Sequence, residues 1–252
     1  MVEVVCFDLG ETLIREERED SELRELGARK LYEILNERGL KLRFEDFKRV
    51  HDALWREAEG ARESMREIDV VNLFYRLLEG AGLEPDQELL QLSVNAYFRV
   101  KLDYVELYPD SIPALEELKD EGYKLALISN AMPSNRLVYE ELGLERFFEV
   151  ALFSYEQGIR KPHPEIFMAA LERLGAGPGE AAMVGNDPVS DIAGAGLLGM
   201  ETFLVVRKPI SGRSLRVLPD HLVSDLRAVP ELLEGRSRGS QQYIGSSAWD
   251  SR

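Results

Sequence analysis

The sequence predicts an α/β protein in which helices cover both faces of a parallel sheet and an all-helical segment is inserted after the first strand. Short apolar runs alternate with helical patterns from residue 102 onward, and this alternation is typical of a parallel sheet buried on both faces. A further apolar run, VVCF, stands at residues 4–7. Between residues 15 and 101 the apolar residues follow helical spacing instead, so we expect this segment to form helices and almost no strand.

Composition limits the classes of function. The chain has 252 residues, of which 44% are hydrophobic, enough for a sizeable core in one large domain or two modest ones. It has no apolar run near the roughly 20 residues that span a bilayer, and its N-terminus lacks the features of a signal peptide. The single cysteine, Cys6, favours a reducing compartment. A net charge of -15 disfavours nucleic acid and anionic membranes as partners. We therefore expect a cytoplasmic protein that binds neither nucleic acid nor membranes. We take it to be a monomer or a homodimer.

The inserted segment contains several stretches whose apolar residues share one side of a helix. In the first, Leu23, Leu31 and Leu35 form a stripe, and Gly39 ends the pattern. We predict a small bundle of helices at residues 21–39, 44–59, 70–82 and 85–102. The charged residues between the stripes are interpreted as solvated faces, including the run EERED at residues 16–20.

The sheet is expected to take its strands from residues 4–7, 123–129, 148–154, 181–186 and 201–206, with a short edge strand within residues 221–226. Helices are predicted after Pro109 and around residues 135–142, 164–174 and 188–199. These elements divide the chain into an α/β core, residues 1–14 and 102–235, and the helical insertion, residues 15–101. Residues 236–252 are rich in Ser, Gly and Arg without periodicity, and we expect them to be disordered.

Polar residues suited to catalysis follow the ends of the predicted strands. Asp8 ends the first strand, and Ser129 and Asn130 end the second. Lys161 lies shortly before a predicted helix. Because the carboxyl ends of parallel strands meet at one edge of a sheet, we expect these side chains to share one crevice. The segment after the fourth strand adds Asn186, Asp187 and Asp191.

This set of side chains suits group transfer from an anionic substrate. A carboxylate such as Asp8 can attack phosphorus or carbon and form an ester intermediate, which water then hydrolyses. The Ser129 hydroxyl, the Asn130 amide and nearby backbone N–H groups can bind phosphate oxygens. Lys161 can neutralise the charge that the nucleophile shares with the transferred group. Carboxylates that face a phosphate need a hard cation between them, and oxygen-only ligands favour Mg²⁺.

These motifs resemble those of the haloacid dehalogenase-like hydrolases, most of which are phosphatases. VVCFDLGETL looks like the family's first motif, LISN like the second, Lys161 in RKPHPEIF like the third and VGNDPVSDIAGAGLLGM like the fourth, in the family's order and spacing. The resemblance implies a Rossmann-like core, an inserted helical cap of the C1 type that closes over the site, and a Mg²⁺-dependent phosphatase with Asp8 as nucleophile. By the same resemblance, Lys161 would be catalytic and would bind substrate together with Thr12, Ser129 and Asn130, and the metal ligands would come from Asp8, Gly10, Asn186, Asp187 and Asp191.

Two positions depart from the family's pattern. Gly10 stands where the phosphatases carry a second aspartate, their general acid and base. Its backbone carbonyl can still contact the metal, but the proton donor for the leaving group is lost, which typically costs about 10²–10⁴-fold in rate. Glu11 is the first candidate to compensate, and His51 in the insertion is the second. Asn186 stands where a metal-binding aspartate is usual, and Asp187 next to it, or Asp191, can restore the charge.

Two other functions stay open at this point. A weakened relative that binds a phosphorylated ligand or a protein partner, and hardly turns over, would also account for Gly10. The family's dehalogenase branch lacks the second aspartate and needs no metal. That branch carries a tyrosine at the position, however, and fewer acids than VGNDPVSD provides. The function that we predict is therefore a metal-dependent phosphatase of a small phosphorylated metabolite.

Overall fold

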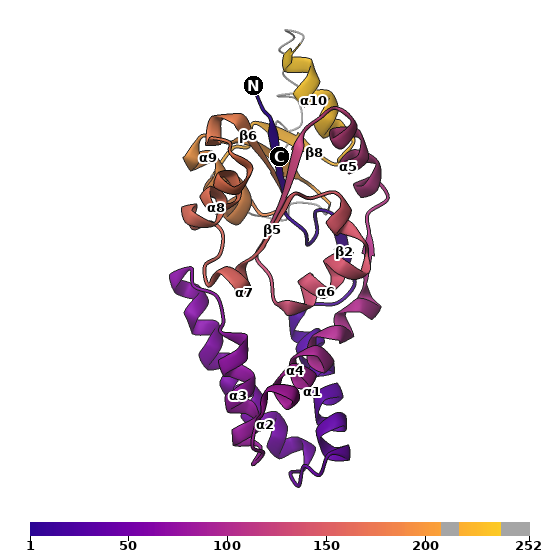
Figure 1. Cartoon of the computed structure of the whole chain (residues 1–252), viewed down its shortest axis with the longest axis vertical. Coiled ribbons are helices and arrows are strands. Elements are labelled where there is room, and N and C mark those ends of the chain that lie inside the picture. Colours follow the sequence, from indigo (N-terminus) through magenta and orange to yellow (C-terminus); the bar gives the residue numbers. More distant parts are fainter. Residues whose placement is uncertain (208–216, 238–252) are drawn as a thin grey trace, which may run out of the picture.

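A six-stranded parallel sheet forms the centre of the larger part of the molecule in the computed structural model, as the sequence predicted (Figure 1). The strand order is β5-β4-β1-β6-β7-β8, and each neighbouring pair is parallel. The strands are β1 (Val4–Phe7), β4 (Lys124–Ser129), β5 (Val150–Phe153), β6 (Ala181–Gly185), β7 (Glu201–Val205) and β8 (His221–Val223). Because β1 lies between β4 and β6, the end of β1 is flanked by the ends of both.

Helices cover the sheet on both faces, which explains the unbroken apolar sequence of the strands. One face packs against α5 (Ser111–Asp120), α6 (Pro133–Glu141) and α10 (Ala228–Ser237), and the other against α8 (Pro164–Leu174) and α9 (Gly194–Leu198). In β1, Val5 and Phe7 face the first set of helices, whereas Val4 and Cys6 face the second. Burial raises the pKa of Cys6 to about 12, so this thiol is an unreactive packing group.

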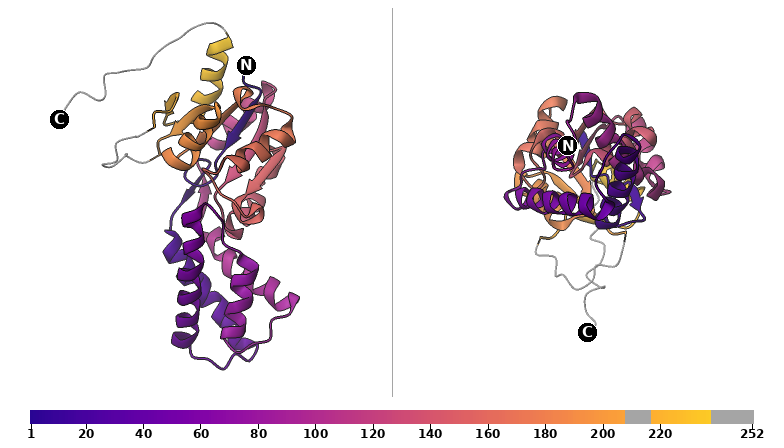
Figure 2. Two further views of the ribbon diagram at one scale, coloured as in Figure 1. Left: turned by 90° about the vertical axis from the view of Figure 1, so that its left-hand side faces the viewer. Right: turned by 90° about the horizontal axis from the view of Figure 1, so that it is seen from below.

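The helical segment forms a separate lobe below the sheet in Figures 1 and 2. Its main helices are α1 (Asp20–Glu37), α2 (Phe44–Glu59), α3 (Val70–Gly80) and α4 (Gln87–Phe98). They enclose their own apolar cluster, with Phe47, Phe74 and Tyr97 at its centre. Short turns of 3₁₀ helix follow α2 and α4, at η1 (Gly60–Ser64) and η2 (Arg99–Tyr104).

A two-stranded antiparallel ribbon joins the lobe to the sheet, and the sequence analysis did not predict it. The ribbon pairs β2 (Ile14–Glu16) with β3 (Val105–Leu107), so the first residues of the predicted insertion are in a strand. Three residues are too few to show an alternating pattern, and each strand depends on a partner far away in the sequence. The ribbon brings the two passages between sheet and lobe side by side.

The structure describes residues 1–207 and 217–237. Residues 236 and 237 of the predicted tail are helical, because α10 continues to Ser237, and the rest of that tail lies outside the described residues. Within the described ranges, no helix is both long and apolar enough to cross a membrane.

His51 of α2 is buried in the helical lobe and makes two polar contacts there. Its Nδ1 lies 2.8 Å from Asp52 Oδ1, and its Nε2 lies 2.9 Å from the Tyr97 hydroxyl. A neutral ring with its proton on Nδ1 satisfies both partners, because it donates to Asp52 and accepts from Tyr97. Burial lowers the pKa of His51 and outweighs the opposing hydrogen bond to Asp52. The ring is therefore a neutral packing group at neutral pH.

We expect the free energy of unfolding to fall as the pH drops below the ordinary pKa of His51. The unfolded chain takes up a proton near 6.5, whereas the folded protein takes it up only at lower pH. The contribution of His51 to stability is thus complete above that pH and declines below it, by at most about 1.4 kcal/mol per pH unit. His51→Gln retains a polar contact to Tyr97 and removes this titration. Between about pH 7.5 and about pH 5.5, the free energy of unfolding measured in urea should change less for the variant than for the wild type. Equal changes in both proteins would contradict the lowered pKa of His51.

Candidate active site

A cavity of about 310 Å³ opens where the carboxyl ends of the central strands meet the helical lobe. Asp8 follows β1, Ser129 ends β4, and Asn186 follows β6. Lys161 enters from the loop before α8. These four residues line the same cavity, so the structure brings together side chains that are far apart in the sequence.

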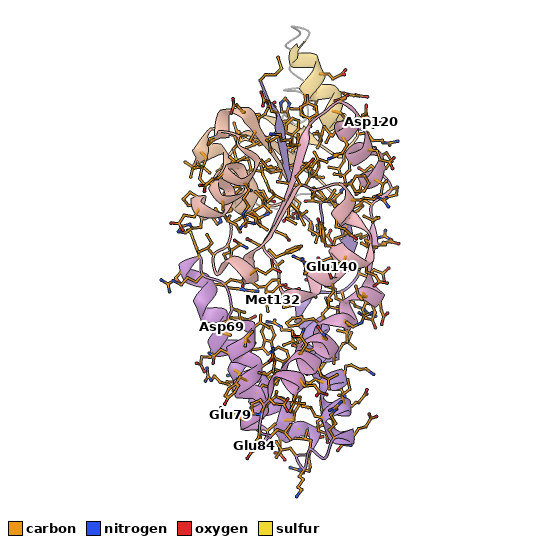
Figure 3. The ribbon with its side chains drawn as sticks, viewed as in Figure 1. Asp69, Glu79, Glu84, Asp120, Met132 and Glu140 are labelled. Atoms are coloured by element: carbon orange, nitrogen blue, oxygen red, sulfur yellow. The ribbon has the colours of Figure 1, made fainter. Side chains whose placement is uncertain are left out.

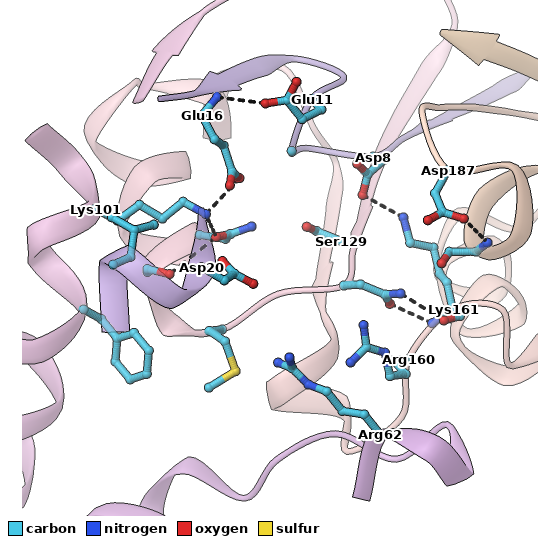
Figure 4. Close-up of a pocket in the computed structure, with 18 of the residues that line it drawn as sticks. Asp8, Glu11, Glu16, Asp20, Arg62, Lys101, Ser129, Arg160, Lys161 and Asp187 are labelled. Atoms are coloured by element: carbon cyan, nitrogen blue, oxygen red, sulfur yellow. Dashed lines mark hydrogen bonds and ion pairs between the residues drawn. The ribbon is translucent and has the colours of Figure 1, made fainter. Parts of the chain in front are cut away.

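The Lys161 ammonium group connects two carboxylates at the bottom of the cavity. Its Nζ lies 2.7 Å from Asp8 Oδ1 (Figure 4) and 2.6 Å from Asp191 Oδ1. Burial alone would lower the pKa of Lys161, but the charges of Asp191 and Asp8 outweigh it and the pKa is raised. For Asp191, burial dominates and raises the pKa to about 6, against the attraction of Lys161. Lys161 therefore stays charged and holds both carboxylates in place.

Thr12 lies behind Asp8 and does not reach the cavity. Its side chain is fully buried, and its hydroxyl lies 3.4 Å from Asp8 Oδ2 and 3.4 Å from Asn186 Oδ1. The predicted contact between Thr12 and substrate is therefore corrected: the chain turns back at Leu9, and this turn directs the hydroxyl toward Asp8. Thr12 positions the carboxylate.

The side chain of Asn130 is bound to the loop that carries Lys161. Its amide N–H donates to the Lys161 carbonyl over 2.9 Å, and its Oδ1 accepts from the Lys161 backbone N–H over 2.7 Å. These two bonds use one N–H of the amide, and the second N–H is the group that the predicted contact with phosphate would use. Asn130 thereby fixes the position of the Lys161 backbone. The Ser129 hydroxyl lies at the end of β4.

The turn after β6 orients Asp187 and Asp191 differently. Asp187 Oδ1 accepts the backbone N–H groups of Val189 and Ser190, each over 2.8 Å, so this side chain caps the helical turn Pro188–Ala193. Asp191 instead points back beneath β6. A Cβ atom at Gly185 would collide with the Asp191 carboxylate, which explains the glycine at the end of this strand.

Cationic residues that the sequence analysis did not single out line the side of the cavity nearest the helical lobe. Arg62 and Arg160 both contact the buried carboxylate of Glu67, with Arg62 Nε 2.9 Å from Oε1 and Arg160 Nη1 3.6 Å from Oε2. The two guanidinium groups lie close together in Figure 4. Burial lowers the pKa of Arg160, against the opposing attraction of Glu67. Met132 lies between core and lobe (Figure 3), and Trp55 of α2 also lines the cavity.

Glu16 and Lys101 form a second ion pair in the cavity wall. Glu16 Oε1 lies 2.8 Å from Lys101 Nζ, and Lys101, only 4% exposed, also donates to Asn135 Oδ1 over 2.7 Å. The interpretation of residues 16–20 as a solvated run is therefore wrong for Glu16, and Asp20 also lines the cavity. The ribbon and α1 turn these two side chains inward, which composition alone does not reveal.

Comparison with known proteins gives one family for most of the chain. The family model described as haloacid dehalogenase-like hydrolase matches residues 2–199. The chain is 32% identical to glyceraldehyde 3-phosphate phosphatase of Methanopyrus kandleri over 212 residues, which cover 82% of this chain and 85% of the relative. It is 38% identical to phosphoserine phosphatase of Thermus thermophilus over 160 residues, or 62% of each chain.

A solved structure shares the fold over nearly the whole chain. The crystal structure of 2-haloacid dehalogenase from Pseudomonas syringae superposes with a TM-score of 0.70 and 29% sequence identity, and the match covers 94% of this chain and 100% of that one. The sheet and the helical lobe thus occur together in a protein whose name refers to a different substrate from those of the two phosphatases.

We expect Asn130→Ala to lower the free energy of unfolding by about 1–3 kcal/mol, because it leaves the backbone N–H and carbonyl of Lys161 without partners. Asn130→Asp keeps the acceptor and loses the donor, so its free energy of unfolding should lie between those of the wild type and Asn130→Ala. Urea unfolding at neutral pH measures these differences. Asn36→Ala, on an exposed position of α1, serves as control and should stay within about 0.5 kcal/mol of wild type. If both alanine variants have the same small effect, the two hydrogen bonds of Asn130 do not secure the loop.

Proposed function

This chain belongs to the haloacid dehalogenase-like hydrolase family, and we propose that it hydrolyses phosphoric monoesters of small metabolites through an aspartyl-phosphate on Asp8. The observation that carries the proposal is the row of Asp8, Lys161 and Asp191 at the bottom of the cavity, with Lys161 Nζ 2.7 Å and 2.6 Å from the two carboxylates. The relatives named as phosphatases support the same reaction. Their names refer to different phosphate esters, so they support a class of substrate and leave its identity open.

In the proposed first step, a carboxylate oxygen of Asp8 attacks phosphorus and the bond from phosphorus to the bridging oxygen breaks. Thr12 and Lys161 hold the carboxylate in place, and Lys161 offsets negative charge that develops on the phosphoryl oxygens. The Ser129 hydroxyl lies at the end of β4, beside the cavity, where it can donate to one of these oxygens. In the second step, water attacks phosphorus, releases phosphate and restores the Asp8 carboxylate.

The oxygen atoms around Asp8 fit a bound Mg²⁺ ion. No group of three His, Cys, Asp or Glu side chains within residues 1–207 and 217–237 forms a metal site, so the proposed set is mixed. It comprises the carboxylates of Asp8 and Asp191, the amide oxygen of Asn186 and the backbone carbonyl of Gly10. Asn186 Oδ1 and Asp8 Oδ2 lie at the same distance from one hydroxyl, that of Thr12, and oxygen-only ligands are those that Mg²⁺ prefers. A bound Mg²⁺ would neutralise phosphate charge and polarise a phosphoryl oxygen.

We further propose that residues 15–101 act as a cap over the core formed by residues 1–14 and 102–235. Cap residues Leu23, Arg24, Trp55 and Tyr97 contribute to the cavity wall, where they can contact the part of the substrate beyond the phosphate. Arg24 and the pair Arg62 and Arg160 supply positive charge there, which favours an anionic substrate. The net charge of -15 and the single cysteine favour a cytoplasmic enzyme that acts on a small molecule rather than on nucleic acid.

Dehalogenation of a 2-haloacid is the second candidate, and the likeness to the Pseudomonas syringae dehalogenase favours it. Gly10 also fits a reaction that needs no proton donor for the leaving group. The buried Asp191 and its neighbour Asn186 argue for a metal-dependent reaction instead. Release of phosphate or of halide from matched substrates distinguishes the two.

We expect Asp8→Asn to abolish hydrolysis of an aryl phosphate in the presence of Mg²⁺, with a loss of at least about 10³-fold in kcat, because an amide cannot form the ester. An aryl phosphate suits the test because its leaving group is a stable anion that departs with little help. Asp120→Asn, at the exposed end of α5 and far from the cavity (Figure 3), is the control and should keep full activity. Substantial turnover by Asp8→Asn would refute the nucleophile. A wild-type protein that hydrolyses no phosphate ester would favour the alternative that this chain binds a phosphorylated ligand or a protein partner and hardly turns over.

The metal should bind weakly because Asn186 contributes an oxygen without formal charge. We expect Asn186→Asp to tighten Mg²⁺ binding about 10-fold, since aspartate keeps the oxygen that accepts from Thr12 and adds a charge. Titration calorimetry measures the affinity, and a chelator should abolish the activity of the wild type. Activity that survives the chelator, with no Mg²⁺ binding by calorimetry, would instead favour the dehalogenase.

A further inference from the structure

The carboxylate of Glu16 occupies the space beside Gly10 that a side chain at position 10 would fill. A Cβ atom built on Gly10 would lie 2.9 Å from Glu16 Oε1. An aspartate carries its own carboxylate oxygens two bonds from Cβ. Glu16 Oε1 therefore lies close to the place where an aspartate at position 10 would put a carboxylate oxygen. Figure 4 shows the carboxylates of Asp8 and Glu16 both directed toward the cavity.

The backbone explains how a residue six positions further on returns to this place. The chain turns sharply after Leu9, whose carbonyl accepts from the N–H groups of Leu13 and Ile14, and Glu11 has a left-handed φ of 53° in this turn. Gly10 then forms a β-bridge with Ile14. Strand β2 therefore starts beside Gly10, and its last residue, Glu16, extends toward the cavity.

Lys101 keeps the Glu16 carboxylate in this position. The two groups are 2.8 Å apart, and the side chains are only 5% and 19% exposed. Lys101 is itself anchored to Asn135 Oδ1 of α6, 2.7 Å away. Since both partners of the ion pair lie largely out of solvent, the pair has less freedom to rearrange than a surface salt bridge.

The two residues that the sequence offered to compensate for Gly10, Glu11 and His51, are hydrogen-bonded elsewhere. Glu11 Oε1 accepts from the Glu16 backbone N–H, and Glu11 Oε2 accepts from the Tyr108 hydroxyl, each over 3.2 Å. His51 is bound between Asp52 and Tyr97 and is not among the residues that line the cavity. Asp187 caps the turn after β6. Glu16 is the carboxylate whose position matches residue 10.

We propose that Glu16 is the general base for the second half of the reaction, and this inference rests on the proposed phosphatase function. The Glu16 carboxylate takes a proton from a water molecule while the water oxygen bonds to phosphorus. The bond from phosphorus to Asp8 breaks, its electron pair returns to Asp8, and inorganic phosphate leaves. Glu16 then loses the proton to solvent. Lys101 is a positioning residue, because it holds the Glu16 carboxylate beside Gly10.

Glu16→Gln tests the proposal because it keeps the size of the side chain and an oxygen for Lys101, and removes the base. Rapid mixing with p-nitrophenyl phosphate and Mg²⁺ follows the first half-reaction through p-nitrophenolate and the second through phosphate. We expect a burst of one p-nitrophenolate per enzyme, then a steady rate about 10²-fold below that of wild type. Mass spectrometry of the quenched enzyme should find a phosphoryl group on Asp8. The matched control is Glu17→Gln, next in sequence and exposed, which should behave as wild type.

A second pair of variants tests the shared position directly. Gly10 has no left-handed φ, so the backbone accepts an aspartate there. In the wild type, however, the new side chain would collide with Glu16. Glu16→Ala removes this obstacle together with the base. We expect the double variant Gly10→Asp/Glu16→Ala to release phosphate at least about 10-fold faster than Glu16→Ala alone.

The outcomes distinguish a failure of the proposed phosphatase function from a failure of the role of Glu16. A wild type that neither hydrolyses p-nitrophenyl phosphate nor becomes phosphorylated on Asp8 would overturn the proposed function itself. If the wild type is active, three results would overturn the role of Glu16 alone: turnover by Glu16→Gln within about 2-fold of wild type, slow turnover without accumulation of phosphoenzyme, or a double variant no faster than Glu16→Ala. A merely structural role of Glu16 would slow both half-reactions and would leave no phosphoenzyme.

Discussion

The site depends on one buried ammonium group placed between two buried carboxylates. Without Lys161, Asp8 and Asp191 would repel each other in a region that excludes most water, and two unpaired buried charges would cost several kcal/mol each. With Lys161 between them, the end of β1, the loop before α8 and the turn after β6 must all meet. Two further features satisfy the same constraint: Asn130 binds the backbone of Lys161, and Gly185 leaves room for the Asp191 side chain.

The sheet makes this meeting possible because β1 lies between β4 and β6. Parallel strands end at the same edge, so residues that follow them become neighbours whatever their distance in sequence. The helical lobe joins the same site through the ribbon of β2 and β3 and through the contact between Glu16 and Lys101. Lys101 lies where the chain returns from the lobe, so the attachment of the lobe and the arrangement of the cavity wall are coupled.

Gly10 shows how a family's motif can change while its chemistry is kept. An aspartate is expected there and is absent, yet a carboxylate oxygen reaches the same region from Glu16, 2.9 Å from where the Cβ atom would be. The longer glutamate side chain spans the distance from the neighbouring strand. Its position then depends on an ion pair with Lys101, whereas an aspartate at position 10 would be positioned by its own backbone.

The sequence by itself determined the α/β core, the helical insertion, the strand-end residues Asp8 and Ser129, and Lys161 before a helix, because buried strands and the ends of elements carry local signals. Only the tertiary structure decided which side chains face the cavity. Asn130 was predicted only as a phosphate donor, and the structure adds a partner 31 positions away, the Lys161 backbone, which its amide binds at both ends. Glu16 looked like a solvated residue, and its partner lies 85 positions away. Charge and hydrogen-bonding capacity are written in the residue type, but the partner that uses them is fixed by the fold, since contacts between distant segments leave no pattern in either segment alone.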